Sequence, residues 1–303
     1  MIYDVLIIGA GPAGLTAGIY AARAGLTALL FEKKFAGGQL ANTDLVENYP
    51  GIASITGVDF AMQMQAHAEE VGAKITSAEI FKIELLGDIK KIYTENEIYE
   101  AKTLILATGA IPRKLGLESE LRLGGKGVSY CATCDGAFFR GRDAAVIGGG
   151  DTAAEDALYL SKIVNRVFMV HRRDKLRAQK FLADKIEKAE NIEVVWDSQL
   201  KEIKGDAVVE SIDVVNKNTN EIRNIPVSGC FIAVGILPES DFIKDLVEIN
   251  DQGYILTSDN LETNIPGVFA AGDVRKKTLR QIVTATSDGA ICVSSVEEYL
   301  NKL

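Results

Sequence analysis

The residues with the most obvious chemistry are two cysteines separated by two residues, Cys131 and Cys134, followed at once by Asp135. A Cys-x-x-Cys pair can supply half of a zinc site or form a redox-active disulfide. Zinc would need two more ligands, whereas Cys230 and Cys292 stand alone in apolar stretches and neither histidine lies in a ligand pattern. We therefore favour a disulfide that is reduced and reoxidised, and we expect Cys230 and Cys292 to be inert buried thiols.

Asp135 directly follows the second cysteine, and a passive carboxylate there would raise the pKa of the thiol by charge repulsion. A proton donor to a leaving thiolate fits this position better. The alternative is an exposed turn residue, because Asp-Gly is a common turn pair.

A glycine-rich loop follows the first predicted strand. The apolar run at residues 5–8 ends in Gly9-Ala10-Gly11-Pro12-Ala13-Gly14, and an Ala-rich helical stretch follows over residues 15–24. In Gly-x-Gly-x-x-Gly each glycine removes a Cβ, either at the tight turn, at the approach to a pyrophosphate or at the helix–strand contact. Glu32 lies 23 residues after Gly9, at the end of the next strand. This order predicts a dinucleotide site in which Glu32 binds a ribose with a free 2′-hydroxyl.

A second loop of the same kind follows a strand at residues 144–147. It reads Gly148-Gly149-Gly150-Asp151-Thr152-Ala153, with alanine as an accepted variant at the third position. At the matching offset of 23 residues stand His171, Arg172 and Arg173, with Arg177 beyond them, in place of an acid. Cations at this position favour NADP(H) over NAD(H), since they can bind a 2′-phosphate. The alternative is a solvated basic turn.

The two loops predict an α/β fold with two Rossmann-like, three-layer dinucleotide-binding domains. A later strand closes each domain, at residues 103–107 and 229–234, so the second domain is inserted into the first. Prolines at 112 and 238 suit the connections. We predict a discontinuous domain of residues 1–111 and 240–303 and an inserted domain of residues 112–239. Segments 75–102 and 193–226 alternate apolar and charged residues and are expected to form antiparallel strands or hairpins.

Charge and hydropathy limit the partners of the chain. The net charge of −9 argues against a surface for nucleic acid or anionic membranes, because both need a basic face. No run of 18 apolar residues predicts a spanning helix, and the first residues lack the pattern of a secretory signal. Four cysteines are too few for a secreted disulfide framework, so we expect a cytoplasmic protein.

The first domain suits a flavin dinucleotide. It begins the chain, carries the ribose-binding acid and ends with Ala271-Gly272-Asp273 after another short apolar run. Asp273 is expected near the group that links the two nucleotide halves.

These motifs together resemble those of the low-molecular-weight thioredoxin reductases over essentially the whole chain. The resemblance rests on both glycine loops, the cysteine motif, residues 37–40, 46–51, 107–110 and 171–177, and the end motifs at 272–274 and 280–281. It implies FAD in the first domain, bound by Gly9, Gly11, Pro12, Ala13, Gly14, Glu32, Gly38, Gln39, Leu40, Asn48, Thr108, Gly109, Gly272, Asp273, Arg280, Gln281 and Ile282. It implies NADPH in the second, bound by Gly148, Gly149, Gly150, Asp151, Thr152, Ala153, Glu155, His171, Arg172, Arg173, Arg177 and Gly235.

The resemblance also implies a reaction, thioredoxin-disulfide reduction by NADPH (EC 1.8.1.9). Cys134 would take electrons from the flavin, Cys131 would attack the disulfide of thioredoxin, and Asp135 would act as the acid. The inserted domain would rotate between the two half-reactions, and the protein would be a homodimer. The alternatives are the same fold with a glutaredoxin-like acceptor, a non-nicotinamide donor such as ferredoxin, or a redox-sensing flavoprotein. The second glycine loop and the Arg172–Arg173 pair argue against another donor.

Overall fold

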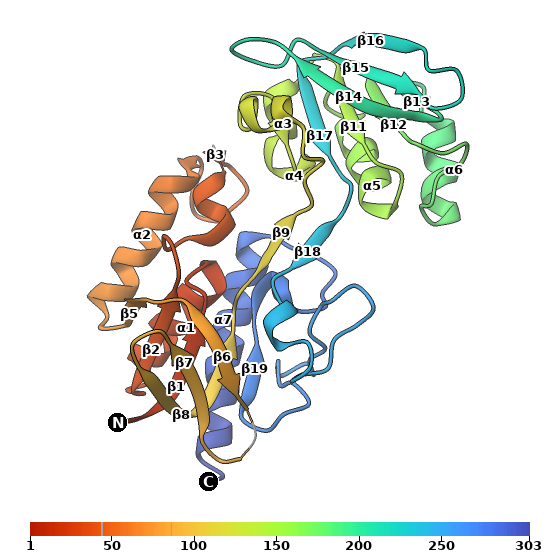
Figure 1. Cartoon of the computed structure of the whole chain (residues 1–303). Coiled ribbons are helices and arrows are strands. Elements are labelled where there is room, and N and C mark those ends of the chain that lie inside the picture. The colour runs from red at the N-terminus through yellow and green to blue at the C-terminus, as the bar shows by residue number, and fades with distance from the viewer. Residues whose placement is uncertain (44, 86) are drawn as a thin grey trace. The chain divides into compact units, whose positions relative to one another are not determined.

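The computed structural model describes residues 1–43, 45–85 and 87–303. The chain divides into two compact units (Figure 1). We call Met1–Ile111 with Leu237–Leu303 the discontinuous unit and Pro112–Ile236 the inserted unit. The second crossing between the units lies three residues before the predicted boundary at residue 239, because Leu237 and the residues after it pack with the discontinuous unit.

The discontinuous unit is built on a seven-stranded sheet with the order β5-β2-β1-β8-β7-β6. The seventh strand, β19, pairs with residues 104–106 of β8, and β7 pairs with residues 98–101. Strands β5, β2, β1, β8 and β19 are parallel, while β8, β7 and β6 are antiparallel. The bounds are β1 Ile2–Ile8, β2 Ala28–Glu32, β5 Lys74–Ser77, β6 Ile80–Glu84, β7 Lys90–Thr94, β8 Ile98–Leu106 and β19 Val268–Ala270.

Three helices cover one face of this sheet, as Figure 1 shows: α1 Pro12–Arg23, α2 Gly57–Glu70 and α7 Ile282–Leu300. Alternate residues of β1 point to opposite faces. Val5 and Ile7 pack with the helices, while Leu6 and Ile8 pack with β6, β7 and residues 243–255. Shorter elements are η1 Gly38–Asn42, β3 Leu45–Val46, β4 Ile55–Thr56, η3 Asp241–Ile243 and η4 Gly272–Val274.

The inserted unit has a parallel five-stranded sheet between helices and a second, antiparallel sheet. Its parallel order is β10-β17-β11-β12-β13, and the antiparallel order is β14-β15-β16. One face of the parallel sheet packs on α5 and α6, and the other packs on the antiparallel strands. The helices are α3 Glu118–Arg122, α4 Ala132–Asp135, η2 Gly136–Phe139, α5 Asp151–Leu160 and α6 Lys180–Lys188. The strands are β10 Val128–Ser129, β11 Ala144–Ile147, β12 Val167–Val170, β13 Ile192–Val195, β14 Ser198–Lys204, β15 Ser211–Asn216, β16 Ile222–Pro226 and β17 Gly229–Ile232.

The two connections between the units are strands β9 Ala110–Pro112 and β18 Ile236–Pro238, which pair with each other. The α/β, three-layer architecture predicted from the sequence is confirmed. Antiparallel strands occupy most of 75–102 and 193–226, but β5 instead extends the parallel sheet beside β2, and β13 extends the parallel sheet of the inserted unit. In the described residues, no helix is both long and apolar enough to cross a membrane.

Candidate active site with two nucleotide loops and a redox disulfide

The first glycine loop joins β1 to α1 through two close backbone contacts. A Cβ on Gly9, whose φ is +100°, would lie 2.4 Å from the carbonyl oxygen of Ala107. A Cβ on Gly14 would lie 1.8 Å from the carbonyl oxygen of Gly9. Any side chain at either position would push α1 away from the strand ends, so these glycines are required for the helix N-terminus to meet the loop.

Glu32 ends β2 directly beside this loop. Its carboxylate accepts hydrogen bonds from the backbone N–H groups of Ala10 and Lys34, both at 3.0 Å. The predicted ribose-binding acid is therefore held at the loop by the backbone. Its contact with a ribose remains a prediction.

Other residues predicted to bind FAD come together from distant parts of the discontinuous unit. The side-chain amide of Asn48 donates to Oε1 of Gln281 at 3.0 Å, and a Cβ on Gly38 would lie 3.3 Å from the Cα of Gly11. The side chains of two residues predicted to bind FAD make contacts within the protein. The Thr108 hydroxyl donates to the carbonyl of Glu239 at 2.7 Å, and the Leu40 side chain is buried in the core. Pro12 and Ala13 begin α1, Gln39 lies in η1, Gly109 has φ +77°, and Ile282 begins α7.

Two buried polar atoms in the discontinuous unit fit the polar part of a dinucleotide. Oδ1 of Asp273 and Nε of Arg280 have no hydrogen-bond partner among the described residues. The Arg280 guanidinium lies 4.0 Å from the centre of the Tyr254 ring. Burial raises the pKa of Asp273. Because unpaired buried polar groups cost free energy, a ligand with hydroxyl and phosphate groups suits this place.

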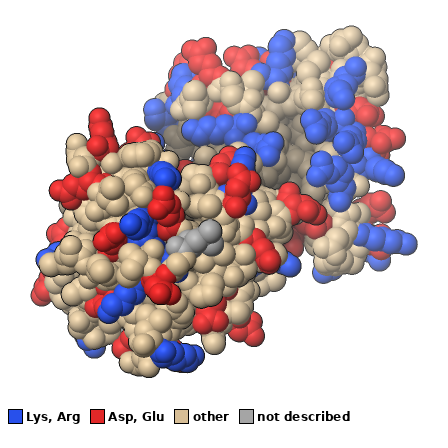
Figure 2. All heavy atoms as spheres, turned by 60° about the horizontal axis from the view of Figure 1, so that its bottom comes forward, with Lys and Arg blue, Asp and Glu red and all other residues tan. Residues whose placement is uncertain are grey.

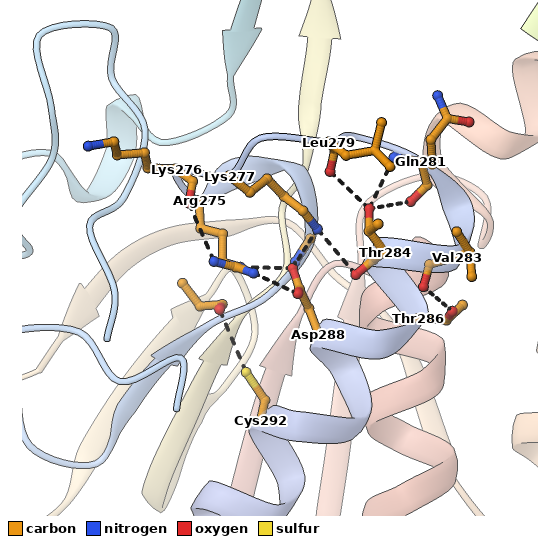
Figure 3. A network of polar contacts seen from close by, with 12 residues as sticks. Arg275, Lys276, Lys277, Leu279, Gln281, Val283, Thr284, Thr286, Asp288 and Cys292 are labelled. Atoms are coloured by element: carbon orange, nitrogen blue, oxygen red, sulfur yellow. Dashed lines mark hydrogen bonds and ion pairs between the residues drawn. The ribbon is translucent and has the colours of Figure 1, made fainter. Parts of the chain in front are cut away.

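In α7, one buried carboxylate holds two cations (Figure 3). Oδ1 of Asp288 accepts from Arg275 at 2.8 Å, and its Oδ2 accepts from Arg275 at 2.8 Å and from Lys277 at 2.7 Å. Oδ2 also accepts from the backbone N–H of Gly272 at 2.9 Å. Burial alone would raise the pKa of Asp288, but the bonds from Arg275 and Lys277 outweigh it, and the pKa lies below its ordinary value. Asp288 thus fixes η4, which carries Asp273, against α7.

The second glycine loop repeats the first in the inserted unit. A Cβ on Gly148 would lie 2.4 Å from the carbonyl oxygen of Ala233. A Cβ on Gly9 would lie at the same distance from the carbonyl oxygen of Ala107. A Cβ on Gly149 would lie 2.0 Å from the imidazole of His171. Nε2 of His171 is 3.0 Å from the carbonyl oxygen of Lys175. Burial, and then the neighbouring arginines, lower the pKa of His171, so a neutral ring closes one side of the loop.

The basic cluster predicted to bind the 2′-phosphate lies beside this loop. The backbone N–H of Arg177 donates to the carbonyl of Gly149 at 2.7 Å, and Asp151 accepts from the N–H of Gln179. Arg172, Arg173 and Arg177 are all exposed, and in the described chain none forms an ion pair with a carboxylate. Figure 2 shows Lys and Arg side chains gathered over one part of the surface. Thr152 and Glu155 lie exposed on α5, and Gly235 has φ +122°.

Cys131 and Cys134 form a disulfide across α4, with Cα atoms 5.3 Å apart. Both cysteines are half-buried. Ser129 Oγ donates to the Asp135 carboxylate and accepts from the Cys131 N–H at 3.0 Å. Asp135 is therefore a half-buried, bonded helix residue, and the exposed-turn alternative is wrong. Its role as an acid remains a prediction.

Cys230 and Cys292 are fully buried, as predicted. Burial raises the pKa of Cys230 to about 12 and also raises that of Cys292, so both stay protonated. Among residues 1–43, 45–85 and 87–303, no cluster of three or more His, Cys, Asp or Glu side chains could hold a metal ion.

Sequence reasoning missed Asp288, its cation partners Arg275 and Lys277, and a buried acid, Glu120, in the inserted unit. A charged side chain in a short polar stretch has no periodic signal that marks it as buried. The one available hint was the spacing of Asp288 on the face of α7 that also carries Ala285 and Cys292.

Comparison with known proteins identifies the family. The sequence pattern of the pyridine nucleotide-disulphide oxidoreductases matches residues 3–289. A thioredoxin reductase of Bacillus subtilis (strain 168) is 45% identical over 303 residues, which cover 100% of this chain and 96% of the relative.

Two solved structures are equally similar in sequence. The thioredoxin reductase from Streptococcus pyogenes MGAS5005 is 46% identical with a TM-score of 0.95 and covers 100% of this chain and 99% of its own. The Lactococcus lactis enzyme in the FR conformation is 46% identical with a TM-score of 0.69 and covers 99% of this chain and 100% of its own. The chain therefore belongs to the pyridine nucleotide-disulphide oxidoreductase family and, within it, to the low-molecular-weight thioredoxin reductases.

Proposed function

We propose that this protein reduces the disulfide of thioredoxin with electrons from NADPH. The observation that carries the proposal is the Cys131–Cys134 disulfide on α4, half-buried and in the same unit as a glycine loop flanked by three exposed arginines, which form no ion pair among the described residues. A redox pair, a site suited to a phosphorylated nicotinamide nucleotide and a second dinucleotide loop together suit an electron relay.

The residues of the discontinuous unit fit FAD, which supplies hydride acceptance and two-electron transfer when bound. The backbone N–H groups at the start of α1 would face its pyrophosphate, and Glu32 would accept from its ribose hydroxyls. The unpaired Asp273 Oδ1 and Arg280 Nε would bond its polar linker. In the inserted unit, Arg172, Arg173 and Arg177 would bind the 2′-phosphate of NADPH.

Two electrons and two protons convert the Cys131–Cys134 disulfide into two thiols. The Cys131 thiolate then attacks one sulfur of the thioredoxin disulfide, and a mixed disulfide forms as the other thioredoxin sulfur leaves. The Cys134 thiolate attacks Cys131, which releases reduced thioredoxin and restores the intramolecular disulfide. Asp135, bonded to Ser129 beside Cys131, would supply the proton for a leaving thiolate.

Rotation of the inserted unit would bring nicotinamide and disulfide to the flavin in turn. The chain passes between the units through the paired strands β9 and β18, as expected of a two-strand hinge. The solved relatives support this motion: two chains with the same 46% identity to this one give TM-scores of 0.95 and 0.69. A homodimer and a cytoplasmic location also form part of the proposal, on family grounds.

A rapid-mixing experiment tests the function. The purified, FAD-loaded protein is mixed with NADPH, thioredoxin and a chromogenic disulfide, while flavin absorbance and colour are followed. We expect flavin reduction by NADPH and colour formation that depends on thioredoxin. A Cys134→Ser variant should retain FAD and lose thioredoxin reduction. If NADPH leaves the flavin of the wild-type protein oxidised, the proposal is wrong.

The same experiment separates the alternatives. Reduction of the flavin by reduced ferredoxin but not by NADPH would indicate the other donor. A glutaredoxin-like acceptor that turns over faster than thioredoxin would change the substrate. Flavin reduction without turnover of any protein disulfide would favour a redox sensor.

A further inference from the structure

Glu120 is a buried carboxylate surrounded by hydrogen-bond donors. Its side chain lies in α3 of the inserted unit, and the residue is 1% exposed. It accepts from three successive backbone N–H groups, those of Leu115 at 3.0 Å, Gly116 at 2.8 Å and Leu117 at 3.3 Å. The Tyr130 hydroxyl donates to Oε1 at 2.7 Å. Within the described part of the chain no cation lies within ion-pair distance of this carboxylate, so backbone and hydroxyl donors alone stabilise its charge.

These donors come from two functionally different places. The three amides begin three residues after the end of β9, the strand by which the chain enters the inserted unit. Tyr130 is joined by a peptide bond to Cys131. A single carboxylate therefore connects the beginning of the unit to the residue before the redox pair.

Further hydrogen bonds connect Cys131 to Asp135, the proposed acid. The N–H of Cys131 donates to Ser129 Oγ, which donates to Asp135. On the other side, the N–H of Ile203 in β14 donates to the hydroxyl of Ser119, so that α3 itself is fastened to the antiparallel sheet. The linker, α3 and the cysteine loop form one bonded assembly.

A buried carboxylate without a counter-ion is an expensive way to fill a core position. Removing its charge from water costs several kcal/mol, which four donors offset only if their geometry is fixed. A buried apolar side chain would avoid this cost, but it would leave the three backbone N–H groups and the Tyr130 hydroxyl without their acceptor. The arrangement therefore points to a requirement for fixed geometry at this place rather than for stability alone.

We propose that Glu120 is a positioning residue that holds the Cys131–Cys134 pair in a fixed relation to the linker β9. Because the linker guides the rotation, the pair then arrives at the flavin in one orientation. The inference rests on the proposed function. It predicts that Glu120 affects the steps in which the disulfide takes part and leaves hydride transfer from NADPH unchanged.

The test uses the FAD-loaded protein with Glu120→Gln, and with Glu118→Gln as the matched control. Glu118 is an exposed acid of the same helix whose side chain forms no hydrogen bond within residues 1–43, 45–85 and 87–303, so its replacement removes the same charge without touching the assembly. In Glu120→Gln, an amide nitrogen faces backbone donors in place of one carboxylate oxygen. We expect flavin reduction by NADPH at the wild-type rate, and thioredoxin turnover about tenfold to a hundredfold slower, as for a small misplacement of reacting groups. The control should match wild type in both steps.

Two further measurements keep the inference testable if Glu120→Gln folds poorly. Tyr130→Phe removes one bond and keeps the ring, and should show the same pattern with a smaller loss of turnover. After reduction with dithiothreitol, alkylation of Cys131 by iodoacetamide, followed by mass spectrometry, should be faster in Glu120→Gln and Tyr130→Phe than in wild type or Glu118→Gln.

The outcomes separate this inference from the proposed function. If wild type shows no flavin reduction by NADPH, the proposed function fails. If the wild-type protein reduces thioredoxin, but Glu120→Gln and Tyr130→Phe keep wild-type rates of turnover and of Cys131 alkylation, then Glu120 does not position the Cys131–Cys134 pair. Equal slowing of flavin reduction and turnover would indicate general damage and would also overturn the inference.

Discussion

At the scale of residues, the two domains place the same demand on their first glycine. Gly9 and Gly148 each lie so close to a carbonyl oxygen, of Ala107 and Ala233, that a Cβ would approach it to 2.4 Å. The third position differs. The space at Gly14 admits no methyl group, whereas the inserted unit carries Ala153 there. The second loop therefore accommodates a methyl group where the first does not.

Asp156 makes a residue-level prediction about pH. Burial, and then the neighbouring Glu155, raise the pKa of this half-buried carboxyl in α5 to about 7. Because the folded-state pKa lies above the unfolded value, the proton-linked stability is fully present below about pH 4 and is lost as the pH rises through 7. Asp156→Asn should therefore stabilise the protein by roughly 1–3 kcal/mol at pH 8 and by much less near pH 4.

Urea denaturation at both pH values measures this effect. Glu187→Gln, an exposed acid of α6, serves as the control for loss of a charge. Equal stabilisation of Asp156→Asn at pH 4 and pH 8 would show that the carboxyl titrates normally.

At the scale of elements, α7 supports the segment that carries Asp273 of the candidate flavin site. Small residues bring it close to α1, since a Cβ on Gly289 would lie 2.3 Å from the carbonyl oxygen of Ala13. Asp288, next to this glycine, binds Arg275, Lys277 and the Gly272 N–H. The close contact between α7 and α1 and the ion network of Asp288 thus lie in the same turn of α7. Together they hold η4 in place.

Asp288→Asn should destabilise the protein and weaken FAD binding together. Removing one partner of a buried network leaves charges unpaired and costs about 3–5 kcal/mol. We expect a lower melting temperature and a higher dissociation constant for FAD, measured by flavin fluorescence during titration of the apoprotein. Glu297→Gln, an exposed acid of the same helix, should change neither. Unchanged FAD affinity in a destabilised Asp288→Asn protein would limit the network to a structural role.

The segment after β12 carries the prediction on nucleotide choice. Replacing Arg172 and Arg173 by Ala should raise the Michaelis constant for NADPH far more than that for NADH, because only NADPH carries the 2′-phosphate. Steady-state kinetics with both nucleotides measure the ratio. An equal change for both would remove the argument for a 2′-phosphate site.

At the scale of the whole molecule, each unit contains its own hydrophobic cores, and the chain passes between the units at the two linkers. The single tryptophan, Trp196, lies in the inserted unit, 6.3 Å from the His171 ring. Tryptophan emission therefore reports on the inserted unit, and FAD bound at the proposed site would report on the discontinuous one.

We expect the two signals to change at different urea concentrations. Excess FAD should move the flavin transition to higher urea without moving the tryptophan transition, and NADP⁺ should do the reverse, because a ligand stabilises the unit that binds it. Coincident transitions that move together with either ligand would show that the two units unfold as one.

The sequence predicted the features that depend on local spacing: both glycine loops, the cysteine pair, the inserted order and the three-layer fold. It missed what depends on contacts between distant segments. Strand β8 begins at Ile98, five residues before the predicted start, because pairing with β7 extends it. Glu120 and Asp288 look like ordinary surface acids in the sequence, and only the folded backbone turns donors toward them.

The inserted order of the units has a consequence for synthesis on the ribosome. Residues 112–236 form one continuous unit that can close as soon as it has emerged. Residues 1–111 emerge earlier, yet β8 lacks its neighbour β19 and α1 lacks α7 until more than a hundred further residues have been translated. During this interval the apolar face of α1 is uncovered, so the nascent N-terminal part is the stretch that a chaperone would have to protect, and the inserted unit would mature before the discontinuous unit.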